Sequence, residues 1–231
     1  MIFLRVPLLT TIVLLVLVGI VFAVRPDLDL SAARLFFHAG TFVGHSPVGD
    51  GARLLGWLVP FVIFGLMVVG WLARRAGLAW PHLPSGRSIA FLAATLALGP
   101  GLLVNVALKD HWHRPRPVQT SEFGGTLPFR PWNALDGGCK RNCSFVSGEA
   151  SSATWLVAPA LLVPPPFQAG AVVGALAFGA AVGVLRMAFG GHFLSDTLIS
   201  MLLTILVVLV GYTWLQRRRT KPIARQERTP S

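Results

Sequence analysis

Two short segments between the apolar stretches combine basic residues with histidine and aspartate. The first, KDHWHRPRP, occupies residues 109–117, and the second, RMAFGGHFLSD, occupies residues 186–196. Lys109, Arg116 and Arg186 offer one ammonium and two guanidinium groups, a set that suits the several oxygens of a phosphate. These residues therefore predict a phosphate site, if the fold brings the two segments together.

A third segment, NCSFVSGEASSATWL at residues 142–156, marks the change from a polar loop to an apolar run. Ser147 and Gly148 stand where a helix would begin, so free backbone amides and the positive end of the helix dipole would face the same anion. Gly148 also lets the backbone come close to a ligand. Glu149 follows as a lone carboxylate among small residues.

His192 and Asp196 form a candidate catalytic pair in the second segment. If a helix begins near the GGH sequence, residues four apart lie on one of its faces. A carboxylate that holds one nitrogen of the imidazole ring leaves the other nitrogen free to attack. The glycines before His192 allow a tight turn that returns Arg186 over the site.

The composition indicates an integral membrane protein, because 54% of the 231 residues are hydrophobic and 13% are charged. We expect an all-α, polytopic fold, a bundle of six transmembrane helices in a single domain, 1–231. Six crossings would place the loop after the third span and the turn after the fifth on the same face. The predicted spans are 7–24, 54–73, 88–108, 150–165, 169–189 and 193–214.

The first span has a second interpretation. Arg5, the apolar run and the small-residue pattern of Val21, Phe22 and Ala23 also fit a cleavable signal peptide. A retained helix is the preferred interpretation, because the apolar run is longer than most signal-peptide cores.

The net charge of +11 does not indicate nucleic acid, because the basic residues are dispersed among the spans and end in the tail at 215–231. Anionic lipid headgroups would suit this tail, and a solvated cluster that holds the last helix in place is the alternative. Positive residues number ten on each side of the predicted topology. Setting aside Lys109, Arg116 and Arg186 as functional favours cytoplasmic termini and a periplasmic 109–149 loop.

Cys139 and Cys143 lie in that loop, in the sequence CKRNC. In an oxidising compartment they could form a small disulfide that tethers the loop to the fourth span. Reduced thiols and a metal-binding pair are the alternatives. A metal site at Asp110, His111 and His113 lacks further ligands at a suitable spacing.

The three segments together resemble the three-part signature of the type 2 phosphatidic acid phosphatase family, which is related to the vanadium haloperoxidases. The resemblance covers residues 88–214 and implies that His192 attacks phosphorus to form a phosphohistidine. It implies that Asp196 orients His192, and that no metal or other cofactor takes part. The groups that it implies on the phosphate oxygens are Lys109, Arg116, Ser147, Gly148 and Arg186.

The sequence departs from the family pattern at three positions. Val146 replaces the usual proline, Leu185 replaces the usual serine, and Glu149 replaces the histidine that protonates the leaving oxygen. We predict Glu149 as the general acid, with His111 and His113 as reserve candidates that otherwise belong to an interfacial belt. The Ser-Gly-acid form most resembles the lipid A phosphatase branch.

The resemblance therefore implies a membrane lipid phosphatase with its site at the outer face of a bacterial inner membrane. Its substrate would be phosphatidic acid, phosphatidylglycerol phosphate, undecaprenyl diphosphate or a phosphate of lipid A, held in the lipid bilayer. The alternatives are a lipid phosphotransferase that uses the same histidine, and a non-catalytic protein that binds or transports lipids or anions.

Overall fold

The computed structural model describes residues 2–78, 80–109 and 111–217, and most of them are helical. Five helical stretches within these residues are long and apolar enough to cross a membrane. The all-α polytopic membrane fold is thus confirmed, whereas a sixth transmembrane helix is not. The five stretches are α1 (Ile2–Val24), α3 (Pro47–Arg75), α4 (Gly86–Leu96) continuing into η1 (Ala97–Leu108), α7 (Pro165–Ala188) and α8 (Leu194–Arg217).

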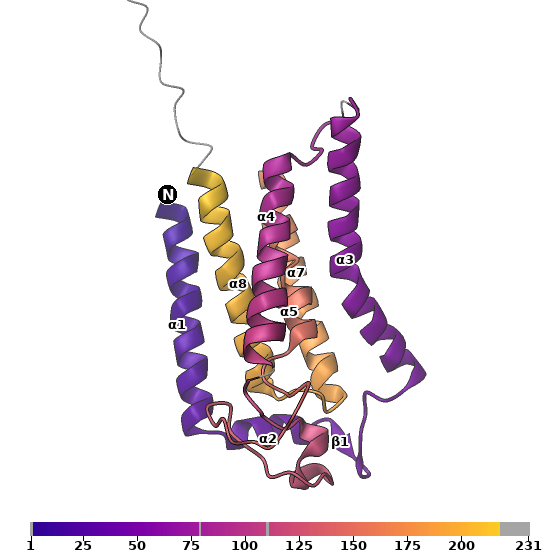
Figure 1. Cartoon of the computed structure of the whole chain (residues 1–231), viewed down its shortest axis with the longest axis vertical. Helices are drawn as coiled ribbons and strands as arrows, with labels where there is room; N and C mark the ends of the chain where they lie inside the picture. Colours follow the sequence, from indigo (N-terminus) through magenta and orange to yellow (C-terminus); the bar gives the residue numbers. More distant parts are fainter. Residues whose placement is uncertain (1, 79, 110, 218–231) are drawn as a thin grey trace, which may run out of the picture.

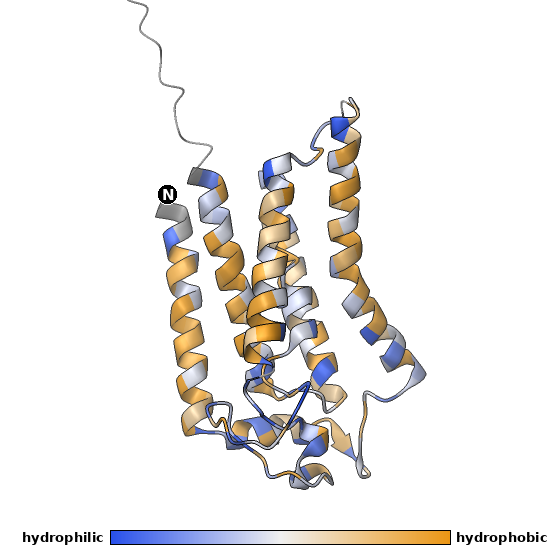
Figure 2. Ribbon diagram, in the orientation of Figure 1, coloured by the Kyte–Doolittle hydropathy of each residue, from blue (hydrophilic) through white to orange (hydrophobic). Residues whose placement is uncertain are grey.

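The long helices carry apolar side chains on their outer surfaces, and Figure 2 shows hydrophobic residues along most of their length. More than half of the surface is exposed at Leu9 and Val16 of α1, Leu66 of α3 and Val173 of α7. A helix satisfies its own backbone hydrogen bonds, so such apolar surfaces are stable against lipid.

Short elements collect at one end of the bundle, the lower end in Figure 1. Helix α2 (Asp27–Arg34) lies there, followed by strand β1 (Phe37–His38) paired antiparallel with β2 (Thr41–Phe42). The loop between η1 and α5 adds two 3₁₀ turns, η2 (Pro117–Gln119) and η3 (Ser121–Phe123). This end carries the candidate site.

The predicted fourth span, 150–165, is wrong as a single helix. It consists of α5 (Gly148–Thr154) and α6 (Val157–Ala160), separated by a turn at Trp155 and Leu156. Pro159 explains the break, because its ring excludes the carbonyl four residues earlier and it has no N–H to donate. The segment is buried among the other helices, where irregular backbone at membrane depth is tolerated.

Polar contacts fix this interior segment to its neighbours. The Ser151 and Thr204 hydroxyls lie 2.7 Å apart and join α5 to α8, while the Trp155 indole donates to Thr95 of α4 over 3.0 Å. Helix α5 also packs closely on α7. Such hydrogen bonds between helices supplement close packing inside a membrane bundle.

Helix α4 widens into the π-helical stretch η1, which contains Pro100. The carbonyl of Pro100 accepts a hydrogen bond from the Asn105 side chain over 2.7 Å. Short π-helical segments often occur at functional sites. Here the stretch ends next to Lys109.

The segment α5–α6 runs from the site end to the opposite end of the bundle. Ser147, which precedes α5, contacts α8 through Ser200, whereas Leu161, which follows α6, lines a cavity with Ser85 and Gln216. The start of α1 and the end of α8 lie together at that opposite end in Figure 1. Residues 218–231, most of the predicted basic tail, lie outside the described residues.

Candidate functional site

The structure brings the two ionisable segments together, as the topology predicts. His192 lies in the connection between α7 and α8, and it is almost fully buried. Its Nδ1 lies 2.6 Å from the carbonyl oxygen of Ser144, in the loop before α5. A carbonyl only accepts, so Nδ1 carries the proton of the neutral ring and Nε2 holds the lone pair. The imidazole is therefore oriented as a nucleophile.

Three cations face this imidazole. Burial, followed by the positive charges of Arg186, Arg116 and Lys109, holds the pKa of His192 well below its ordinary value of 6.5. The same charges that favour a neutral ring would attract a phosphate. The imidazole and the candidate anion-binding cations thus lie in the same part of the molecule.

Asp196 does not hold His192 directly, which corrects the arrangement expected from their spacing. Helix α8 begins at Leu194, so His192 precedes the helix and does not share a helical face with Asp196. The carboxylate instead accepts from the Ser144 hydroxyl over 2.5 Å and from the Phe193 amide over 2.8 Å. Asp196 therefore acts on the imidazole indirectly, through Ser144. The carboxylate accepts from the Ser144 hydroxyl, and the Ser144 carbonyl contacts His192.

Arg114 is the central cation of a buried network that the sequence did not predict. Its guanidinium donates to Asp196 over 2.5 Å and to Asp29 over 2.7 Å, and all three side chains are fully buried. It also lies over the Phe193 ring, 4.5 Å from the centroid. Buried charges are stable only when paired and hydrogen-bonded, and this arginine meets both conditions.

Asp29 of α2 brings the N-terminal part of the chain into this network. Its two carboxylate oxygens accept from the amide and hydroxyl of Ser195 over 2.8 and 2.6 Å, besides the contact with Arg114. The sequence signal for Asp29 is weak, because Asp27 lies two residues away and is exposed. Only the tertiary structure distinguishes the two acids.

Arg116 and Lys109 occupy the edge of the site. Arg116 donates to the carbonyl of Asn142 over 2.8 Å and to its side-chain oxygen over 2.7 Å. These contacts anchor the guanidinium against the loop that carries Ser144. Lys109 follows η1 and is half-buried.

Arg186 is buried near the end of α7, and its guanidinium lies over Gly191. A Cβ atom built on Gly191 would lie 2.5 Å from Arg186 Nη2, so a larger residue there would displace the Arg186 side chain from its present position. Arg186 Nε is 3.4 Å from Glu149 Oε1, an ion pair without hydrogen-bond geometry, and it has no hydrogen-bond partner within the described part of the chain. This buried Nε–H is therefore a donor that an anionic ligand could use.

Glu149 also pairs with Arg53, a residue of α3 that the sequence did not single out. The Arg53 guanidinium donates to the carboxylate from Nη2 over 3.0 Å and from Nε over 3.2 Å. Glu149 thus bridges Arg53 on α3 and Arg186 on α7. It is 18% exposed, whereas the Arg53 side chain is 45% exposed.

Ser147 and Gly148 lie at the start of α5, as predicted. Ser147 is fully buried and caps the helix, its hydroxyl accepting from the Ala150 amide over 3.4 Å. Its own amide donates to the Asp196 carbonyl, also over 3.4 Å. A Cβ atom on Gly148 would lie 2.5 Å from the side-chain oxygen of Asn105 in η1, so a larger residue there would displace the Asn105 amide.

The two histidines of the loop contact backbone carbonyls. The rings of His111 and His113 contact the carbonyls of Ala107 and Cys139, respectively. Asp110, part of the alternative metal site, lies outside the described residues. Cys139 and Cys143 form a disulfide.

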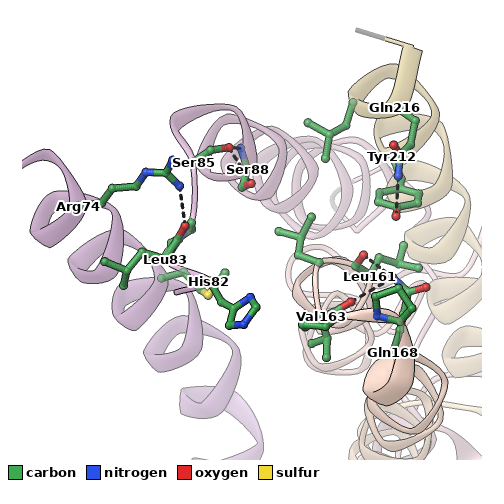
Figure 3. Close-up of a pocket in the computed structure, with 16 residues that line it drawn as sticks. Arg74, His82, Leu83, Ser85, Ser88, Leu161, Val163, Gln168, Tyr212 and Gln216 are labelled. Atoms are coloured by element: carbon green, nitrogen blue, oxygen red, sulfur yellow. Dashed lines mark hydrogen bonds between the residues drawn. The ribbon is translucent and has the colours of Figure 1, made fainter. Parts of the chain in front are cut away.

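A cavity of about 460 Å³, lined by both polar and apolar residues, opens at the other end of the bundle (Figure 3). Arg74 and Gln168 lie beside it, each donating to a nearby backbone carbonyl, Arg74 to Leu83 and Gln168 to Leu161. Its distance from His192 along the bundle excludes it from the candidate site.

Comparison with known proteins points to one family. The sequence pattern of the PAP2 superfamily matches residues 87–220. The chain is 36% identical over 203 residues to a lipid A 4'-phosphatase of Rhizobium leguminosarum, covering 81% of this chain and 87% of the relative. It is 33% identical to a lipid A 4'-phosphatase of Francisella tularensis subsp. novicida, covering 87% of this chain and 91% of the relative. No solved structure gives a significant match.

Proposed function

Because the chain belongs to the PAP2 superfamily and is a membrane lipid phosphatase, we propose that it hydrolyses a phosphate monoester of a lipid A-type glycolipid through a phosphohistidine. The environment of His192 is the main observation that supports this mechanism. Its Nδ1 is held by the Ser144 carbonyl, and three cations lie around the ring. The substrate class is supported by the names of the relatives.

In the first step, the Nε2 lone pair of His192 attacks phosphorus and forms a P–N bond. The bond between phosphorus and the leaving oxygen breaks, and that oxygen takes up a proton. In the second step, water attacks phosphorus and gives up a proton to the group that protonated the leaving oxygen, the P–N bond breaks, and inorganic phosphate leaves with neutral His192 restored. Nucleophilic catalysis of this kind divides one difficult displacement into two easier ones.

The cations stabilise the charge on the equatorial oxygens in both steps. We assign this role to Lys109, Arg116 and Arg186, joined by the Ser147 hydroxyl and the Gly148 amide. Electrostatic stabilisation by fixed donors is usually the largest contribution to phosphoryl transfer. Asp196 acts through Ser144, since its carboxylate fixes the residue whose carbonyl orients His192.

Glu149 is the candidate for the group that protonates the leaving oxygen. It belongs to the cluster through its contact with Arg186. If it donates the proton, Glu149→Gln slows a substrate with a poor leaving group much more than one with a good leaving group. Equal losses on both substrates would exclude this role and assign Glu149 to positioning Arg186.

The site faces the periplasm in this proposal, with the termini in the cytoplasm. The Cys139–Cys143 disulfide in the site-bearing loop supports this orientation, because disulfides persist in oxidising compartments. The lipid substrate would reach the site from the outer leaflet of the inner membrane.

A phosphate-release assay in detergent tests the proposal, using lipid A, phosphatidic acid, phosphatidylglycerol phosphate and undecaprenyl diphosphate. We expect the fastest release from lipid A, and a loss of at least about 10³-fold in His192→Ala, in line with removal of a nucleophile. Release that does not depend on His192 would refute the mechanism. A preference for a lipid without a sugar would refute the substrate class.

A further inference from the structure

A second cavity, of about 380 Å³, lies beside the candidate site and has no role in the mechanism above. Its volume falls within the range of about 300–1,000 Å³ that is typical of small-molecule sites. The α3 residues that line it recur at the spacing of one helical face. The lining residues are Asp50, Arg53, Leu54 and Trp57 of α3 and Glu149 of α5.

The cavity shares a wall with the phosphate site. Glu149 accepts from Arg53 over 3.0 Å on the cavity side and lies 3.4 Å from Arg186 on the other. The charge of Arg53 also acts on Arg116 and Arg186. A molecule in the cavity would therefore lie next to a phosphate held at His192.

The lining groups match the chemistry of a sugar ring. The carboxylates of Asp50 and Glu149 accept hydrogen bonds and the Arg53 guanidinium donates them, as adjacent hydroxyl groups require. Trp57 is 48% exposed and offers a flat apolar surface to the C–H face of a ring. A glycerol headgroup presents no comparable face.

We propose that this cavity binds the sugar ring that carries the scissile phosphate, with Trp57 and Arg53 as specificity-determining residues. The inference rests on the proposed function, because it names the part of the substrate that lies beyond the phosphorus. Glu149 then lies between two subsites, and its carboxylate fixes a guanidinium on each side.

The test uses the full-length protein in detergent with lipid A as substrate and inorganic phosphate as a competitive inhibitor. We expect Trp57→Ala to raise KM for lipid A about tenfold or more, while the inhibition constant of inorganic phosphate changes by less than about twofold. Trp57→Phe keeps an aromatic face and should stay within about threefold of wild type. Trp80→Ala, an exposed tryptophan at the other end, is the matched control.

Two results would overturn the inference. The first is an unchanged KM for lipid A in Trp57→Ala, and the second is an equal change in KM and in the phosphate inhibition constant, which would indicate a distorted phosphate site. Failure of the proposed function gives a different result, because wild type itself would then release no phosphate from lipid A.

Discussion

At the scale of single residues, the proposed mechanism requires that His192 stay neutral among cations. Its lowered pKa, caused by burial and then by Arg186, Arg116 and Lys109, means that the nucleophilic form persists below pH 6.5. Protonation removes the lone pair, so the acidic limb of the pH profile of kcat/KM should lie below the ordinary histidine value. A limb above 6.5 would contradict this view.

The variant Arg116→Gln shows whether the acidic limb of the pH profile reflects the pKa of His192 or the pKa of the substrate phosphate. Phosphate monoesters themselves titrate near pH 6, and this value is the same for both enzymes. Removing a positive charge that acts on His192 raises its pKa, so the acidic limb should move to higher pH in the variant. Superimposable limbs would show that His192 is not the titrating group.

Arg114 is expected to control stability as well as activity. Arg114→Ala leaves the carboxylates of Asp29 and Asp196 buried without their cation, and breaking a buried pair typically costs about 3–5 kcal/mol. Thermal unfolding in detergent measures this loss. Arg25→Ala removes the cation of an exposed ion pair with Asp27 and should leave the melting temperature unchanged. Equal changes in melting temperature for Arg114→Ala and Arg25→Ala would refute the stabilising role of the buried network.

The sequence predicted the residues that topology alone brings together, but not the supporting network. Arg186 and His192 are separated by one turn, so a single connection explains their proximity. Asp29 and Arg114 are 85 positions apart, and Arg114 resembles any cation that follows a membrane span. No sequence pattern distinguishes a buried arginine there from one that contacts lipid headgroups.

At the scale of elements, the contact between α5 and α7 positions both Glu149 and Arg186. A Cβ atom on Gly179 would lie 2.4 Å from the Thr154 hydroxyl oxygen, so Gly179→Ala should lower the free energy of unfolding by about 1–3 kcal/mol. A Cβ atom built on Gly174, on the same helix, would have no atom of a neighbouring element within 4 Å. Gly174→Ala should therefore be neutral or slightly stabilising, and a larger loss there would refute the packing argument.

Hydropathy predicted the long helices well, because each presents apolar residues to lipid over its whole length. It failed at α5–α6, where the apolar run that follows Thr154 suggested a span, although the segment is short, carries several polar residues and lies inside the bundle. Pro159 gave the physical reason for the break, but proline is also tolerated within membrane helices, as Pro60 in α3 shows. The outcome depended on packing that the sequence does not reveal.

At the scale of the whole molecule, the orientation of the bundle is testable through an exposed position of the site-bearing loop, Asp136. A membrane-impermeant maleimide should label an Asp136→Cys variant in intact spheroplasts without reduction, and should not label the wild type, whose Cys139 and Cys143 are buried in a disulfide. Labelling that requires permeabilised membranes would place the site in the cytoplasm and reverse the proposed topology.

The most direct test of the whole account is to trap the covalent intermediate. Rapid quenching of the enzyme with a lipid phosphate, followed by mass spectrometry, should find a phosphoryl group on His192, and none should form in His192→Ala. Lipid-phosphate turnover without a phosphorylated His192, or continued turnover in His192→Ala, would contradict the mechanism.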